Sequence, residues 1–121
     1  LRMALSKLPD SPMVMNNLAY AILKFEPENL AEAKQLIERA LNIPGVALSG
    51  RAAMLDTLAE IHHFEGDDLK AIQLFEEAIT LDGNKLDTRQ KLVEAYQKVG
   101  MTELALVQQD RIQALQQQRE Q

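Results

Sequence analysis

The chain has 121 residues, 46% of them hydrophobic, which is enough for one folded domain, but 4% aromatic content and no Trp make its core aliphatic. A net charge of −5 argues against nucleic-acid binding, and the lack of Cys excludes disulfides and thiolate metal sites. The sequence is rich in Ala, Leu, Glu, Gln and Lys and has no alternating run of β-branched residues, which predicts an all-α fold.

The first nine residues predict a short helix that stops at a proline. Leu1, Ala4 and Leu8 share one helical stripe, and Pro9 cannot continue the helix. Because the sequence opens inside this amphipathic pattern, we expect residues 1–9 to be the second helix of a truncated preceding repeat, in a piece of a larger protein. A frayed terminal tail is the alternative.

Residues 12–47 predict a pair of helices. Ser11 followed by Pro12 is a strong helix start, because Ser caps the first turn and Pro fits the first helical position. After a turn, Asn29 and Glu32 predict a capping box for the second helix.

Residues 52–85 contain the clearest helical hairpin. One apolar stripe precedes Gly66, and another follows it through Ala71 and Phe75 at a spacing of four residues. Gly66 suits the left-handed residue that ends a helix, and either of the two aspartates after it can cap the next helix. A single hairpin of this length cannot bury its stripes alone and needs a copy on each side.

Residues 86–119 predict a third hairpin, with Asn84 as the cap of its first helix. The second helix keeps Leu104, Ala105 and Ile112 on one side and is otherwise polar. The last helix of an array meets water on its outer face, so we expect this helix to act as a cap. A coiled-coil partner helix is the alternative, although the apolar stripe is too short for several heptads.

The three hairpins repeat at a spacing of 34 residues, which a loop lengthens to 40 between the first two. This pattern resembles the tetratricopeptide repeat family. The matching positions are Leu58, Ala59, Gly66, Ala71, Phe75 and Ala78, repeated as Leu92, Tyr96, Gly100 and Ala105, with departures at His62, Gly83 and Gln109. The resemblance implies a right-handed α-α superhelix, or solenoid, with repeats at about 12–47, 52–85 and 86–119 in a domain of residues 10–121, preceded by the half repeat 1–9.

Residues that could carry catalysis or hold a metal are sparse. His62 and His63 are adjacent, so on a helix they point about 100° apart and cannot grip one metal ion. The Ser and Gly residues stand singly, without a nucleophile elbow or a phosphate-binding loop. We therefore expect no enzyme activity, no cofactor and no metal site. No apolar run approaches the roughly 20 residues that span a bilayer, so no membrane insertion is expected either.

In tetratricopeptide repeat proteins, the first helix of each repeat lines a concave groove that binds partner segments. The groove positions that this resemblance implies are Met13, Asn16, Asn17, Tyr20 and Leu23, then Ala53, Asp56, Thr57, Glu60 and His63, then Asp87, Gln90, Lys91, Glu94 and Gln97. Asn side chains can pair with any peptide backbone through a donor and an acceptor, so Asn16, Asn17 and Tyr20 are the leading candidates. Ordinary hydrated surface is the alternative for each residue.

The charge of these positions bears on the partner. One subgroup of the family binds chaperone C-terminal carboxylates through Lys and Asn, and this sequence resembles it only at Asn17 and, less closely, at Lys91. Asp56, Glu60 and Glu94 place negative charge where such a carboxylate would approach. We therefore expect a protein or peptide partner with a neutral or basic segment.

The leading expectation for function is a protein–protein interaction scaffold. The alternative is a structural spacer or self-association module of a bacterial secretion or envelope assembly, with a homodimer formed through an exposed terminal helix. A third reading is a regulatory module attached to an enzyme elsewhere in a parent protein. The compartment stays open between the cytoplasm, which is slightly favoured, and the periplasm.

Overall fold

The computed structural model describes residues 1–120, and within them it consists of helices joined by turns, with no β-strand. The all-α prediction is therefore confirmed. The elements in chain order are α1 (Arg2–Lys7), α2 (Pro12–Phe25), the short 3₁₀ helix η1 (Pro27–Asn29), α3 (Leu30–Leu41), α4 (Leu48–Phe64), α5 (Asp68–Leu81), α6 (Leu86–Lys98) and α7 (Thr102–Glu120).

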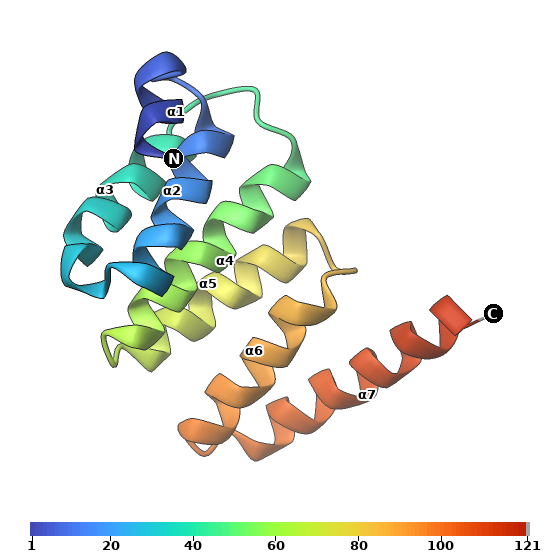
Figure 1. Cartoon of the computed structure of the whole chain (residues 1–121). Helices are drawn as coiled ribbons and strands as arrows, with labels where there is room; N and C mark the ends of the chain where they lie inside the picture. The colour runs from blue at the N-terminus through green and yellow to red at the C-terminus, as the bar shows by residue number, and fades with distance from the viewer. Residues whose placement is uncertain (121) are drawn as a thin grey trace.

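The helices from α2 onward pair as three successive antiparallel hairpins, α2 with α3, α4 with α5 and α6 with α7 (Figure 1). Each hairpin contacts the next, because α3 packs against α4 and α5 packs against α6. In addition, α2 packs directly on α4, and α1 packs on α2. None of the helices in residues 1–120 combines the length and the apolar character needed to cross a bilayer.

The turns of the second and third hairpins have the same backbone geometry, 34 residues apart. Gly66 and Gly100 both adopt a left-handed conformation, with φ of 87° and 82°. In each turn, the residue after the glycine donates its N–H to the carbonyl five residues earlier, Asp67 to His62 at 2.9 Å and Met101 to Tyr96 at 2.8 Å. The prediction of a left-handed Gly66 is confirmed, and its counterpart has the same role.

The predicted helix caps meet mixed outcomes. Ser11 accepts a hydrogen bond from the N–H of Val14 at 3.3 Å, as expected. The capping box at Asn29 is wrong, because Glu32 is drawn away to Arg2 at 2.8 Å and the Asn29 amide donates to a different carboxylate. The Asn84 cap is also wrong: α6 begins one residue later, after Lys85.

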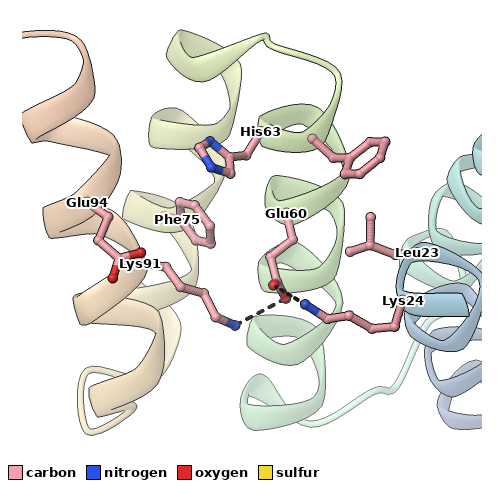
Figure 2. A pocket seen from close by; sticks show the side chains of 8 residues that line it. Leu23, Lys24, Glu60, His63, Phe75, Lys91 and Glu94 are labelled. Carbon is pink, nitrogen blue, oxygen red and sulfur yellow. Dashed lines mark hydrogen bonds and ion pairs between the residues drawn. The ribbon is translucent and has the colours of Figure 1, made fainter. Parts of the chain in front are cut away.

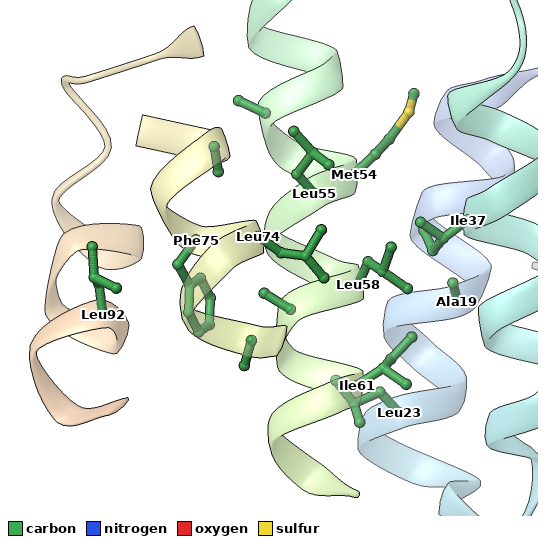
Figure 3. Packing of buried hydrophobic residues seen from close by; sticks show 14 of the residues in the cluster. Ala19, Leu23, Ile37, Met54, Leu55, Leu58, Ile61, Leu74, Phe75 and Leu92 are labelled. Atoms are coloured by element: carbon green, nitrogen blue, oxygen red, sulfur yellow. The ribbon is translucent and has the colours of Figure 1, made fainter. Parts of the chain in front are cut away.

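The core is aliphatic and continuous through all three hairpins. Phe75 is 2% exposed and Ala71 is fully buried, so both stripes of the middle hairpin face the interior as predicted. Figure 3 shows Phe75 turned toward Leu92 of the third hairpin, while Ile61 lies beside Leu23 of the first hairpin. The middle hairpin thus contributes side chains to packing on both of its sides.

The last helix, α7, buries only a narrow stripe. Ala105 and Ile112 are buried against α6, but Leu104 is 48% exposed, contrary to the prediction that it shares their side. Successive helical residues are rotated by 100°, so Leu104 cannot follow Ala105 into the interface. Leu106 and Val107 are exposed as well, so α7 presents apolar side chains to solvent.

Candidate functional site

A pocket lies between α2, α4 and α6 and encloses about 380 Å³. Its apolar lining consists of Leu23 from α2, Phe64 from the end of α4 and Phe75 from α5. Figure 2 shows Phe75 between α4 and α6, with Leu23 on the opposite side of α4. The polar lining consists of Lys24, Glu60, His63, Lys91 and Glu94.

A chain of ion pairs crosses the pocket from α2 to α6. Lys91 Nζ lies 2.8 Å from Asp56 Oδ1 and 3.1 Å from Glu60 Oε2. Lys24 Nζ approaches the other oxygen of Glu60 at 3.5 Å, so this carboxylate is shared by two lysines (Figure 2). The buried hydroxyl of Thr88 donates to the second oxygen of Asp56. The network therefore joins the first helices of all three hairpins.

The environment of Lys91 fixes its charge. Partial burial opposes the charged form, but the hydrogen bond and charge of Asp56, together with Glu60, outweigh burial and raise the pKa of Lys91. Lys91 is therefore a permanent cation that is already engaged by two carboxylates.

A second carboxylate ties α4, α5 and α6 together beside the pocket. Asp68 Oδ1 lies 2.7 Å from His63 Nδ1, and Asp68 Oδ2 lies 3.2 Å from Lys98 Nζ. Burial of Asp68 favours its protonated form, but the hydrogen bonds from His63 and Lys98 prevail and lower its pKa. His63 is thus oriented by Asp68 rather than left free in the pocket.

The charges that line the pocket nearly balance. Lys24 and Lys91 offset Asp56 and Glu60, with which they form ion pairs. Glu94 is exposed, and within residues 1–120 no cation lies within ion-pair distance of it. The pocket therefore carries about one unbalanced negative charge, at Glu94.

The structure brings some of the predicted groove residues together and leaves others apart. Glu60, His63, Lys91 and Glu94 line the pocket, and Asp56 contacts Lys91 at its edge. The remaining predicted residues lie outside it: Met13, Asn16, Asn17, Tyr20, Thr57 and Gln90.

Three of these outlying residues have specific surroundings. Thr57 is buried and its hydroxyl donates to the carbonyl of Ala53 at 3.1 Å, so a partner cannot reach it. Asn16 has a buried Oδ1 with no hydrogen-bond partner among residues 1–120. The ring of Tyr20 is 44% exposed, and its centre lies 5.3 Å from Lys24 Nζ.

Sequence reasoning missed two lining residues, Lys24 and Phe64. The repeat register contains a signal for the second one, because the spacings of 40 and 34 residues align Phe64 with Lys24 and Lys98. An aromatic side chain therefore stands where the neighbouring repeats carry cations. The pairing of Lys24 with Glu60 had no such signal, since it depends on how closely α2 packs on α4.

The structure places no metal site in the described part of the chain: residues 1–120 contain no group of three His, Asp or Glu side chains that could hold an ion. His62, the other candidate histidine, is partly buried with its Nδ1 3.7 Å from Asp67. Burial lowers the pKa of His62, with the nearby charge of Lys34 acting in the same direction. A neutral, packed side chain is consistent with a role in the fold.

No model of a known protein family matches the chain, and no protein of curated function is recognisably similar to it. The resemblance to tetratricopeptide repeats therefore rests on residue spacing, and a function has to be inferred from the pocket.

Proposed function

We propose that the chain is a tetratricopeptide-repeat-like interaction module that binds a segment of a partner protein in the pocket between α2, α4 and α6. The observation that supports this most is the pocket itself, whose walls come from the first helices of three successive hairpins. A volume of about 380 Å³ with an apolar base and a few polar groups is typical of a recognition site.

The ionisable groups favour binding over catalysis. The lysines and most of the carboxylates of the pocket pair with each other. Such pairing holds each group in its charged form, whereas an acid–base catalyst needs a pKa near the working pH. The pocket therefore offers shape and fixed charge rather than a proton donor or a nucleophile.

The charge of the pocket supports a neutral or basic partner segment, but on narrower grounds than the sequence indicated. Asp56 and Glu60 are neutralised by lysines, so they neither repel an acidic ligand strongly nor attract a basic one. Glu94 remains to set the preference. We expect the discrimination between basic and acidic segments to be modest and sensitive to salt.

The proposal can be tested by selecting binders from a library of random peptides displayed on phage. Selected peptides would be titrated against isotope-labelled protein and followed by NMR. We expect shift changes to centre on Leu23, Phe75 and Lys91. Enrichment of no peptide, or shift changes confined to another surface, would overturn the proposal.

A matched pair of phenylalanines controls this experiment. Phe64 and Phe25 both end the first helix of a hairpin and are 59% and 82% exposed, but only Phe64 lines the pocket. Phe64→Ala should weaken selected peptides about tenfold, the loss expected for part of an aromatic contact. Phe25→Ala should leave their affinity unchanged.

A second candidate function is self-association as a structural spacer, which the exposed Leu104, Leu106 and Val107 of α7 favour. Light scattering over about a hundredfold range of concentration separates the two candidates. A constant monomer mass supports the binding module. A mass that rises with concentration, and that Val107→Glu returns to the monomer value, supports the spacer.

A further inference from the structure

We infer that the pocket recognises one large aliphatic or aromatic side chain that is followed by a lysine or arginine in the partner segment. This inference rests on the proposed function and names the chemistry of the segment. It follows from the depth of the apolar lining, from the exposed aromatic ring at the edge, and from the position of the unbalanced charge.

The depth of the pocket sets the size of what it holds. Leu23 and Phe75 are 7% and 2% exposed, so the little surface that they offer is reached only from inside the cavity. They come from different hairpins, and α4 lies between them (Figure 2). About 380 Å³ is near the lower end for ligand pockets, which suits one inserted side chain rather than a helix laid along the surface.

The edge of the pocket carries an aromatic ring that an inserted side chain would cover. Phe64 is 59% exposed at the end of α4 and lines the same cavity as Leu23 and Phe75. Burial of aromatic and aliphatic surface is the main source of affinity at such anchors. An alanine in the partner segment would leave most of this surface in water.

The polar edge of the pocket selects the neighbouring residue. Glu94 follows Lys91 by three residues on α6, so both side chains face the same side of the helix. Lys91 is held by Asp56 and Glu60, whereas Glu94 has no cation at ion-pair distance within residues 1–120. A cation beside the anchor can pair with Glu94. An acidic residue there would meet like charge and find Lys91 already engaged.

Four acetylated peptide amides test this directly: Gly-Leu-Arg-Gly, Gly-Trp-Arg-Gly, Gly-Ala-Arg-Gly and Gly-Leu-Glu-Gly. Their affinities would be measured from the methyl NMR signals of Leu23 at low and at moderate salt. We expect the Leu-Arg and Trp-Arg peptides to bind at least about fivefold more tightly than the Ala-Arg and Leu-Glu peptides, with the Arg preference shrinking as salt rises.

Variants separate the two parts of the inference. Glu94→Gln should abolish the preference for Arg over Glu and keep the preference for Leu over Ala. Glu103→Gln, at an exposed carboxylate in the first turn of α7 outside the pocket, should change neither. Phe64→Ala should reduce the preference for Leu over Ala, and Phe25→Ala should not. Each variant is first checked for an unchanged urea midpoint.

Three results would overturn the inference. Equal binding of the Leu and Ala peptides would remove the anchor, and equal or tighter binding of the Glu peptide would remove the role of Glu94. A free apolar molecule such as benzyl alcohol that shifts the Leu23 signals as strongly as the Leu-Arg peptide would indicate a small-molecule site. If phage-selected peptides still bind the pocket in these cases, the proposed function survives, whereas it fails too if no peptide perturbs Leu23.

Discussion

The α2–α4 and α4–α6 junctions have equivalent positions in the repeat but opposite chemistry. At the first junction α2 packs directly on α4, with Leu23 beside Ile61 (Figure 3). At the second junction α6 packs mainly on α5 and reaches α4 through polar side chains, with Lys91 bridging to Asp56 and Glu60. The repeat register aligns Asn16 of the first junction with Asp56 of the second, and only Asp56 has polar partners.

This difference explains where the pocket forms. Apolar side chains must touch to exclude water, so they draw α2 onto α4. Long side chains that pair by charge can bridge a wider gap, as Lys91 does, and leave room between the helices. The chemistry of a junction, rather than the hairpin repeat itself, therefore decides whether a binding cavity opens beside it.

The largest effect is expected from removing the ring that supports the second junction. Phe75→Ala should lower the free energy of unfolding by about 3–5 kcal/mol, since it empties a buried site between α4 and α6. The matched change in the first hairpin, Ile37→Ala, should cost about 2–5 kcal/mol but leave peptide binding to the residual folded fraction intact. Urea unfolding measures both. A loss below about 1 kcal/mol for Phe75→Ala would contradict the packing described.

A smaller effect should come from the aligned polar pair. Asp56→Ala leaves the Thr88 hydroxyl and the Lys91 ammonium without their partner, and should cost about 2–3 kcal/mol. Asn16→Ala removes an oxygen that has no hydrogen-bond partner in residues 1–120, and should change stability by less than about 1 kcal/mol. Equal losses in urea unfolding would mean that the two junctions do not differ in the way proposed.

Acid should loosen the second junction before the first. Because the folded-state pKa of Asp68 lies below its ordinary value of 3.8, its contribution is complete above that value and is lost as the pH falls through the lowered one. The loss should be on the order of 1 kcal/mol. Unfolding free energies at about pH 6 and pH 3 should fall further for the natural protein than for Asp68→Asn. Hydrogen exchange should locate the loss at α6 rather than α2.

The smallest effect is expected at the exposed end of the ion-pair chain. Lys24→Met removes a contact of 3.5 Å at a side chain that is 43% exposed, so stability should change by less than about 0.5 kcal/mol. The change should be undetectable at high salt. A loss above about 1 kcal/mol in urea would show that Glu60 depends on both lysines equally.

Elements that depend on local chemistry were predictable from the sequence. The hairpin stripes through Ala71 and Phe75, the Ser11 cap and the left-handed Gly66 all follow from short-range spacing. The Asn29 cap was wrong because a distant side chain, Arg2, competes for Glu32. Local patterns cannot contain such long-range competition.

The candidate site was only partly predictable for the same reason. The register identified the four polar lining residues Glu60, His63, Lys91 and Glu94, although it also included the buried Thr57. It could not show that Lys91 is engaged by Asp56, because that contact depends on the gap between α4 and α6. Charge at a sequence position therefore overstated the negative character of the surface.

The paired glycine turns bear on how distant relatives of this chain could be recognised. No atom lies within 4 Å of where a side chain would begin at Gly66 or Gly100, so volume does not restrict either position. What restricts them is handedness, which asparagine tolerates better than other residues with a side chain. A search pattern that admits glycine or asparagine at this interval, and leaves the surface letters unspecified, would detect divergent copies that overall similarity misses.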